Sequence, residues 1–498
     1  MKTQFVQGGV KTLKNDGIAL FFFEDAKLFA EKSKTITRIF THAKGVIESG
    51  DFSGKKNSVS VCYQGSGKTT KRIFLVGLGK KADFKAEQLR RSASAASRAA
   101  SKSKVSNLAL ELIDIDVLNA HSVAEATVEG AYLGPYKFDK YINGGKSASK
   151  LKTLTFFTDS KTTGAESKSG VAFGTALCEG VYLTRDLANA PNNEIYPETL
   201  GERAVDAGEK AGFKVTVLNK KEIEDLKMGG LLAVNAGSVR PPVFIVMEYN
   251  GGQVGEAPVV LVGKGVTFDT GGISIKPGPG MSDMKIDMHG SASVIGGIYA
   301  IAKLKLPMNV VALVPATENM PSGTAFVPGD IVTHMNGKTS EIDNTDAEGR
   351  LILADALTYA DRYKPAAVID IATLTGACGI ALGGVTTGLM GNDDSLKSRI
   401  KKAAERTNEY VCELPLYEEY EEQIKSDYAD VKNSGGRPAG AITAALFLKM
   451  FIGNYKWAHL DIAGTGIAGK EGYYTPRGGS GVGVRLFVDL IRNWKNDA

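Results

Sequence analysis

The 498-residue sequence has 60 lysines and arginines against 55 aspartates and glutamates, so its net charge is only +5. This balance excludes a strong overall attraction to nucleic acid or to an anionic membrane surface. The chain is 43% hydrophobic and 23% charged, as in a globular protein, and it is longer than the roughly 250–300 residues that one core supports.

The cysteines and the chain start indicate where the protein resides. No two of the four cysteines form a Cys-x-x-Cys pair, which argues against a disulfide framework and a zinc–thiolate site. Met1–Phe5 leads into polar sequence rather than the apolar run of a secretory signal. No stretch approaches the roughly 18 apolar residues of a membrane helix. We therefore expect a soluble protein of the cytoplasm.

In chain order, the first part alternates short β-rich runs with helical patterns, which predicts an α/β domain. The expected helix is Phe84–Lys104. The expected strands are Gly17–Phe23, Ser58–Gln64, Arg72–Gly79, Asn107–Ile113 and Thr153–Thr158. Asp159–Gly170 is rich in Ser, Lys, Thr and Gly and lacks periodicity, so it is predicted to be the linker.

The second part has continuous apolar runs, which suit strands buried on both faces of a sheet. The expected strands are Val243–Tyr249, Pro258–Val262, Asn309–Val314, Ala366–Ile371 and Trp457–Ile462. The expected helices are Ser291–Leu306, Leu351–Tyr363, Ser395–Val411, Ala439–Phe451 and Val484–Trp494. The fold class is therefore α/β, with a smaller N-terminal α/β domain at 1–165, a linker and connecting helix at 166–185, and a larger C-terminal α/β domain with a helix-covered mixed sheet at 186–498.

Three segments near predicted strand ends and helix starts concentrate ionisable residues. Val262–Gly272 follows a strand and contains Lys264 and Asp269, with Lys276 shortly after it. Met284–Gly290 contains Asp287, and Asp343–Arg350 contains Asp346 and Glu348 directly before a helix. Ligands of open α/β sheets gather beyond the carboxyl ends of strands, which makes these segments the candidate site.

Four carboxylates gathered in one place would repel and partly protonate, so their convergence requires cations. Asp346 and Glu348 are two residues apart, and in an extended backbone they would point to the same side and hold ions together. Oxygen ligands favour Mg²⁺ or Mn²⁺, and carboxylates also bind Zn²⁺, so ligand type leaves the ion open.

Three basic residues add to this interpretation. Lys264 can be a metal ligand only as the neutral amine, which adjacent divalent cations favour. Lys276, if it stays charged, can polarise a carbonyl oxygen. Arg350 stands where a helix begins, and its guanidinium beside free backbone N–H groups is typical of an anion site.

At this point the sequence resembles the leucyl aminopeptidase family, also called cytosol aminopeptidases. Asn344–Leu351 reads Asn-Thr-Asp-Ala-Glu-Gly-Arg-Leu, which matches the family's signature octapeptide. Further similar stretches are Lys227–Val234, Asp370–Ala377, Arg437–Leu448 and Trp457–Gly464. The resemblance covers most of residues 180–498 and is weak before them.

The resemblance implies two divalent metal ions per subunit, Mn²⁺ or Zn²⁺, with Mg²⁺ as a further alternative. One ion would be held by Asp269, Asp346 and Glu348, and the other by Lys264, Asp269, Asp287 and Glu348. It implies that Lys276 contacts the substrate carbonyl and that Arg350 holds a bicarbonate that accepts the proton of a metal-bridging water. The implied side-chain pocket is Met284, Thr373, Gly376 and Ala463.

The implied activity is removal of the N-terminal residue, with leucine and other apolar residues preferred, from peptides with a free N-terminus. The C-terminal domain would be catalytic, and the N-terminal domain would serve assembly or regulation. The implied assembly is a homohexamer, a dimer of trimers. His289 and Ser291 stand where relatives usually carry other small residues, which bears on pocket shape and metal preference.

Simpler interpretations stand beside these. His289, His334 and His459 lack a metal-binding spacing such as His-Glu-x-x-His and are expected to be structural. Gly65–Thr69 lacks the first glycine of a phosphate loop and is expected to be a hairpin turn.

Two alternatives from other classes remain, a metal-binding pseudoenzyme and a DNA-binding protein. The second would use the basic stripe of the Phe84–Lys104 helix, which is otherwise a solvated helix face. That stripe consists of Arg90, Arg91, Arg98, Lys102 and Lys104.

Overall fold

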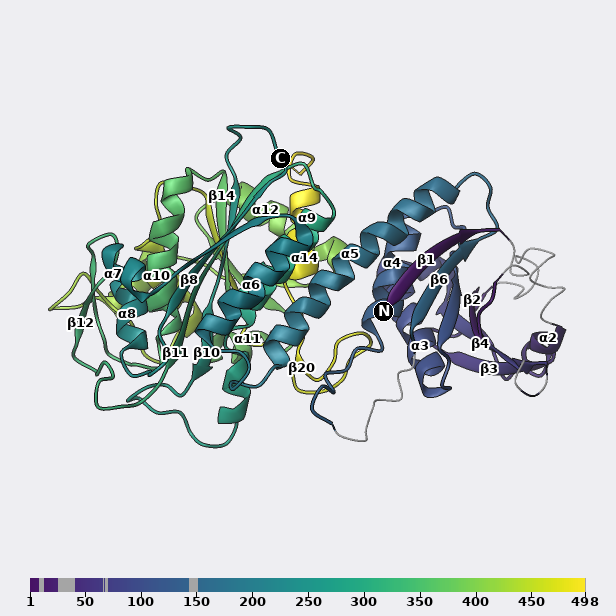
Figure 1. The fold of residues 1–498 in the computed structure, drawn as a ribbon, viewed down its shortest axis with the longest axis horizontal. Coiled ribbons are helices and arrows are strands. Elements are labelled where there is room, and N and C mark those ends of the chain that lie inside the picture. Colours follow the sequence, from purple (N-terminus) through teal and green to yellow (C-terminus); the bar gives the residue numbers. More distant parts are fainter. Residues whose placement is uncertain (9–12, 26–40, 66, 68–69, 143–150, 498) are drawn as a thin grey trace. The chain divides into compact units, whose positions relative to one another are not determined.

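The structure is a computed structural model that describes residues 1–8, 13–25, 41–65, 67, 70–142 and 151–497 (Figure 1). The chain divides into two compact units. The small unit comprises Met1–Cys178 and Glu471–Pro476, and the large unit comprises Glu179–Lys470 and Arg477–Ala498. Among the described residues, no helix combines the length and the apolar character that crossing a membrane requires.

The small unit is built on a sheet with the strand order β1-β6-β5-β2-β4-β3. Its neighbouring strands run parallel except for β3 and β4, which are antiparallel, as expected for a hairpin. Residues 66, 68 and 69 of the predicted turn lie outside the described residues. The strands are β1 (Lys2–Gln7), β2 (Gly17–Phe23), β3 (Val59–Gln64), β4 (Lys71–Gly79), β5 (Asn107–Glu111) and β6 (Thr153–Thr158).

Helices α3 and α4 pack tightly against each other beside this sheet (Figure 1). Glycine makes the approach possible, because a Cβ at Gly130 would lie 1.9 Å from the carbonyl oxygen of Arg90. The other sheet face carries a core that includes Ile18, Leu20 and Phe22. The helical segments are α2 (Thr41–Glu48), η3 (Lys81–Asp83), α3 (Ala86–Lys102) and α4 (Ala120–Leu133).

The predicted basic stripe is solvated only in part, because Arg90 is buried whereas Arg91 and Arg98 are partly exposed. Arg90 is buried and pairs with Glu129 across the two helices, with 3.0 Å between Nε and Oε1. Arg91 pairs with Glu87, and Arg98 donates to the carbonyl oxygen of Gly472 at 2.6 Å. Within this helix the three arginines have protein partners, which removes most of the support for DNA contact by the stripe.

The predicted linker is partly helical, because α5 (Gly164–Asn189) begins inside it. Small residues explain why no periodicity was visible. A Cβ at Gly170 would lie 2.3 Å from the carbonyl oxygen of His121, so this glycine lets the start of α5 pack closely on α4. The division between the units falls inside this helix, after Cys178.

The large unit contains a mixed sheet with the strand order β16-β15-β18-β14-β9-β11-β8-β7, and β10 pairs with β11. Strands β14, β18, β9, β10 and β11 pair in parallel, whereas β7 with β8, β8 with β11 and β15 with β18 are antiparallel. The strands are β7 (Lys214–Leu218), β8 (Val243–Asn250), β9 (Val259–Gly263), β10 (Gly265–Asp269), β11 (Asn309–Asn319), β14 (Ala367–Ala372), β15 (Thr387–Gly391), β16 (Val411–Glu413) and β18 (Trp457–Asp461).

Helices cover the sheet, as predicted (Figure 1). Every residue of β9 is buried. Val260 and Val262 join a core that includes residues of α10 and α13, and the alternating Val259 and Leu261 point to the opposite face. The helical segments are α6 (Pro197–Ala211), α7 (Lys220–Asp225), α8 (Gly229–Asn235), η4 (Met281–Ile286), α9 (His289–Lys303), α10 (Gly349–Ala360), η5 (Asp361–Tyr363), α11 (Gly376–Leu382), α12 (Asp394–Thr407), η6 (Glu418–Ile424), α13 (Gly440–Lys449) and α14 (Val484–Arg492).

Two small sheets complete the large unit. One is β12-β13-β17, formed by β12 (Ile331–Thr333), β13 (Thr339–Glu341) and β17 (Val431–Lys432). The other pairs β19 (Ile467–Ala468) with β20 (Gly478–Gly479).

The helix predicted at Ser395–Val411 ends earlier, at Thr407. Asn408 adopts a left-handed conformation with φ 60°, which stops the helix, and Val411 then begins strand β16. The predicted helix was too long because Tyr410 and Val411, which follow the cap, were included in its apolar pattern.

The parallel strands bring their carboxyl ends to one edge of the sheet. Strand β10 ends at Asp269, β11 at Asn319 and β18 at Asp461, and Thr373 follows the end of β14. This edge carries the polar residues of the candidate site.

Candidate metal centre

The five predicted metal ligands lie at a strand end or in loops at this sheet edge. Lys264 links β9 to β10, Asp269 ends β10, and Asp287 directly follows η4. Asp346 lies in a turn, and Glu348 directly precedes α10.

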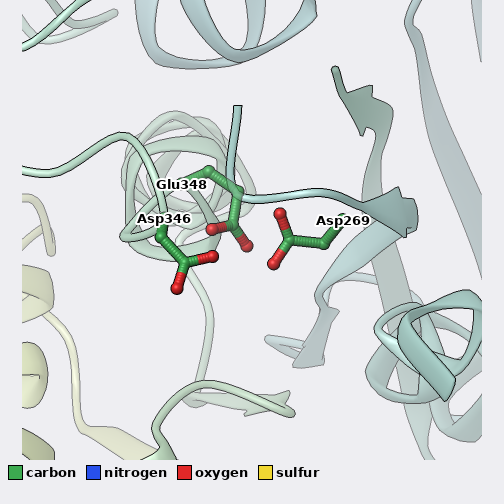
Figure 2. A group of neighbouring side chains, drawn as sticks. All are labelled: Asp269, Asp346 and Glu348. Carbon is green, nitrogen blue, oxygen red and sulfur yellow. The ribbon is translucent and has the colours of Figure 1, made fainter. Parts of the chain in front are cut away.

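Three carboxylates converge there. One carboxylate oxygen from each of Asp269, Asp346 and Glu348 lies within 4.8 Å of the other two. Figure 2 shows the three side chains pointing toward one another. They form the group that the resemblance assigns to one ion.

The backbone that carries Asp346 and Glu348 is not extended, contrary to the prediction. Glu348 has helical angles, φ −76° and ψ −37°, and Asp346 lies in a turn. Side chains hold this turn: Asn344 Oδ1 accepts the Asp346 N–H at 2.9 Å, and the hydroxyl of Thr345 donates to the carbonyl of Gly271 at 2.6 Å. The two carboxylates therefore meet through a turn into a helix and not through strand alternation.

Lys264 is 3% exposed and lies between two carboxylates. Its Nζ is 2.7 Å from Asp287 Oδ2 and 2.8 Å from Glu348 Oε1, and it donates to the carbonyl of Thr373 at 3.1 Å. Helix α10 starts with Gly349, where a Cβ would lie 2.5 Å from Lys264 Cε. The absence of a side chain at Gly349 thus makes room for the lysine.

Lys276 lies on the other side of the cluster. Its Nζ is 2.7 Å from Asp269 Oδ2 and also pairs with Asp346 Oδ1. Its side chain is 21% exposed, so this ammonium group is accessible from outside, unlike that of Lys264.

Other side chains hold the carboxylates in place. Asp269 Oδ1 accepts the amide of Asn319 and the N–H of Gly271, both at 2.8 Å. Asp287 Oδ1 accepts the hydroxyl of Thr373 at 2.7 Å. These bonds fix the direction in which each carboxylate faces the centre.

Burial is the largest influence on the carboxyl groups. It raises the pKa of Asp269 to about 6, and the charge of Glu348 adds to this effect. Burial also raises the pKa values of Asp287 and Asp346. Burial acts on Glu348 in the same direction, but the ammonium groups of the two lysines outweigh it and lower its pKa.

For the two lysines, neighbouring carboxylates affect the pKa more than burial does. Burial lowers the pKa of Lys264, but the carboxylates of Asp287 and Glu348 outweigh it, so that its pKa is raised. The pKa of Lys276 is raised in the same way, chiefly by Asp269. Both side chains therefore favour the ammonium form, and a cation bound at Lys264 must displace its proton.

The donor set fits divalent cations. If all four carboxyl groups are ionised, they exceed the two ammonium groups by two negative charges, and this excess is unfavourable in a buried place without a further cation. In addition, Asp287 Oδ2, Asp346 Oδ1 and Glu348 Oε1 are buried and are paired with the ammonium groups of Lys264 and Lys276. Divalent cations bound to these oxygen atoms would take the place of the ammonium contacts.

Arg350 lies in the first turn of α10 and is 8% exposed. Its Nη1 donates to the carbonyl of Asn433 at 2.7 Å, whereas its buried Nε has no hydrogen-bond partner in the parts of the chain that are described. Burial lowers the pKa of Arg350 to about 10. A buried guanidinium with an unused donor suits a bound anion.

The predicted pocket residues lie on loops at the same sheet edge. Thr373 follows β14 and contacts Asp287, Gly376 begins α11, and Ala463 follows β18. Met284 lies in η4, three residues before Asp287. A Cβ at Gly376 would meet no described atom within 4 Å, so there is open space beside it.

Sequence reasoning missed three supporting residues, Asn319, Asp461 and Asn433. The first two end strands β11 and β18, so the rule of carboxyl strand ends would have indicated them. Asp461 accepts the hydroxyl of Thr375 at 2.6 Å and thereby fixes the start of α11. Asn433 follows the two-residue strand β17, for which no sequence signal was available.

The expected structural histidines make internal hydrogen bonds. His289 Nε2 accepts the N–H of Gly481 at 3.1 Å, and His334 Nε2 lies 2.8 Å from the hydroxyl oxygen of Ser340. His459 pairs with Asp370, 2.5 Å away, on the neighbouring strand. These contacts agree with structural roles.

A helix-covered mixed sheet with carboxylates and lysines gathered at its carboxyl edge defines a metal-dependent hydrolase site. Residues 182–488 match the catalytic domain of the cytosol aminopeptidase family, and residues 19–143 match the N-terminal domain of that family. The chain belongs to the cytosol aminopeptidase family and is a metallo-exopeptidase.

The chain is similar to individual relatives over nearly its full length. The chain is 46% identical to a probable cytosol aminopeptidase of Roseiflexus castenholzii, over 90% of this chain and 92% of the relative. It is 44% identical to a probable cytosol aminopeptidase of Chloroherpeton thalassium, over 99% of this chain and 100% of the relative. The extensive coverage includes the small unit, where the motifs alone gave little resemblance.

Solved structures show the same fold. A mutant of tomato leucine aminopeptidase superposes with a TM-score of 0.87 at 34% identity, covering 99% of this chain and 96% of that chain. The bottromycin maturation enzyme BotP in complex with Mn superposes with a TM-score of 0.84 at 34% identity, covering 96% and 99%.

Proposed function

We propose that this aminopeptidase uses two divalent cations to remove N-terminal residues, with leucine and other apolar residues preferred, from peptides with a free N-terminus. The observation that carries the proposal is the convergence of Asp269, Asp346 and Glu348 beside Lys264 and Asp287. These five residues would hold the ions, with Asp269 and Glu348 shared between them.

The ions would be Mn²⁺ or Zn²⁺, with Mg²⁺ as a further alternative, and the manganese complex of the similar BotP supports the first of these. Two bound cations would supply Lewis acidity, which lowers the pKa of water and stabilises negative charge on the substrate carbonyl oxygen. The residues around them then bind and orient the peptide.

Lys276 would donate a hydrogen bond to the carbonyl oxygen of the bond to be cleaved. Its ammonium group is partly exposed and its pKa is raised, so it keeps its charge at neutral pH. A fixed positive charge at a developing oxyanion stabilises the transition state.

Arg350 would hold a bicarbonate as proton acceptor. Its buried Nε has no partner in the described residues, and its Nη1 is fixed by the carbonyl of Asn433. The guanidinium therefore presents an oriented donor to a small planar anion.

Met284, Thr373, Gly376 and Ala463 would line the pocket for the substrate's first side chain. The open space beside Gly376 would accept an apolar side chain such as leucine. Small residues at two of these four positions support a pocket of this size.

We extend the proposal to assembly and location. Residues 1–165 would serve assembly or regulation, residues 166–185 would connect them to a catalytic domain at 186–498, and the protein would act as a homohexamer in the cytoplasm. Sedimentation of the purified protein tests the hexamer, because a monomer would contradict it.

The central test is hydrolysis of leucine p-nitroanilide by chelator-treated protein before and after addition of Mn²⁺, Zn²⁺ or Mg²⁺. We expect cleavage only with added metal, and none of the N-acetylated substrate, because the free amine is required for binding. Folded protein that stays inactive with every ion, or that cleaves the acetylated substrate equally well, would contradict the proposal.

A further inference from the structure

Asn433 is a completely buried side chain whose amide is fully used by one loop. Its Oδ1 accepts the N–H groups of Asp343 and Asn344, at 2.8 and 3.2 Å. Its Nδ2 donates to the carbonyl oxygens of Asn344 and Ala347, at 2.7 and 3.4 Å. An amide offers two acceptor and two donor positions, and all four are directed at residues 343–347.

The same residue also holds the arginine beyond this loop. Its backbone carbonyl accepts Nη1 of Arg350 at 2.7 Å. Asn433 therefore contacts the chain on both sides of Asp346 and Glu348 while touching neither carboxylate.

Asn433 is itself anchored outside the centre. Its N–H donates to the carbonyl of Glu341 at 2.9 Å, and strand β17 pairs in parallel with β13. Asp430 extends this contact, because its Oδ2 accepts the N–H of Thr339 at 2.8 Å. The small β12-β13-β17 sheet thus provides a fixed point from which the amide holds the loop.

We infer that Asn433 is a positioning residue, which sets the loop 343–348 so that the carboxylates of Asp346 and Glu348 face Asp269 and bind divalent cations. The inference rests on the proposed function for the identity of the bound groups. Contacts from the other side, such as the bond of Asn319 to the carbonyl of Thr345 at 3.1 Å, hold one flank of the loop, and Asn433 holds the opposite flank.

The isosteric variant Asn433→Asp tests this arrangement. It keeps the shape and the acceptor but replaces the donor Nδ2 by an oxygen, which would face the carbonyl oxygens of Asn344 and Ala347. Repulsion between these oxygens should move the loop. Changes in residues that orient metal ligands typically reduce metal affinity or activity by about 10- to 100-fold, and we expect a loss in this range.

The experiment is calorimetric titration of Mn²⁺ into the chelator-treated full-length protein. The control is Asn392→Asp, the same amide change at an exposed residue that directly follows β15. Asn392 donates to the carbonyl of Tyr455 at 3.0 Å and accepts the N–H of Trp457 at 2.7 Å. We expect the control to keep wild-type Mn²⁺ affinity, and Asn433→Asp to lose at least tenfold.

Hydrolysis of leucine p-nitroanilide gives a second readout. At limiting Mn²⁺ we expect Asn433→Asp to lower kcat with little change in KM, and raising Mn²⁺ to restore part of kcat. Equal loss of stability in both variants with unchanged Mn²⁺ affinity in Asn433→Asp would overturn the inference. If Asn433→Asp does not fold, Asn433→Ala, which adds no charge, takes its place with the same expected outcomes.

The titration also separates this inference from the proposed function. Wild-type protein that binds Mn²⁺ but cleaves no peptide would contradict the proposed function, while the affinity loss in Asn433→Asp would still support the positioning role. Wild-type protein that binds no divalent cation would overturn both.

Discussion

A single methyl group at Gly349 should disable the centre. In Gly349→Ala the added Cβ would stand 2.5 Å from Cε and 2.7 Å from Nζ of Lys264. Carbon atoms pack at about 3.5–4.0 Å, so the lysine has to move by about 1 Å. That movement takes its Nζ away from Asp287 and Glu348, which now lie 2.7 and 2.8 Å away.

The structure gives a magnitude for this change. A displacement of 1 Å in a reacting group costs about 100-fold in rate, and overpacking of a buried site costs about 1–3 kcal/mol of stability. We expect kcat for leucine p-nitroanilide with saturating Mn²⁺ to fall about 100-fold, with a modest loss in Tm.

A matched glycine serves as the control. Gly323 is exposed, and a Cβ there would meet no described atom within 4 Å, so Gly323→Ala should behave as wild type. Wild-type kcat and Mn²⁺ affinity in Gly349→Ala would refute the view that the missing side chain makes room for Lys264.

Three further predictions follow from single side chains. Lys276→Ala should lower kcat at least about 100-fold, the range found for lost oxyanion stabilisation, and near-normal turnover would remove the proposed role. Gly376→Ala should lower kcat/KM for leucine substrates roughly tenfold more than for alanine substrates, measured in competition, because its methyl group takes pocket space. Burial raises the pKa of Cys378 to about 12, so it stays a neutral thiol at pH 8. We therefore expect iodoacetamide to modify it, by mass spectrometry, only after unfolding; rapid labelling of the folded protein would contradict this.

Strands were predictable where buried apolar runs end at polar residues. Both ends of β2, at Gly17 and Phe23, agree with the prediction, because every residue of that strand is buried. The start of helix α5 was less visible, because residues 164–170 are small or polar and the close contact of Gly170 leaves no hydrophobic period.

The residue types in the motifs identified the centre, but its geometry could not be predicted from the sequence. The motifs indicated that Asp269, Asp346 and Glu348 converge, and the structure brings them together. The turn that joins the last two, with Glu348 already in helical conformation, was missed because two-residue spacing suits several backbones. Asn433 was missed since hydrogen-bond complementarity between distant segments leaves no pattern in either one.

The ligand assignment itself stays a prediction, and so do the domain limits at 165 and 186. Binding of a cation at Lys264 requires the loss of its proton.

Residues 471–476 give the small unit a discontinuous sequence. Within that unit they supply the backbone carbonyls that Arg98 binds and the ring of Tyr473, over which Arg91 lies at 4.6 Å. A truncated chain that stops at Cys178 would leave these arginines without those partners. Truncation at a single position therefore cannot yield the complete small unit. Shortening the loop around Tyr473 would destabilise a domain that lies almost three hundred residues earlier in the chain.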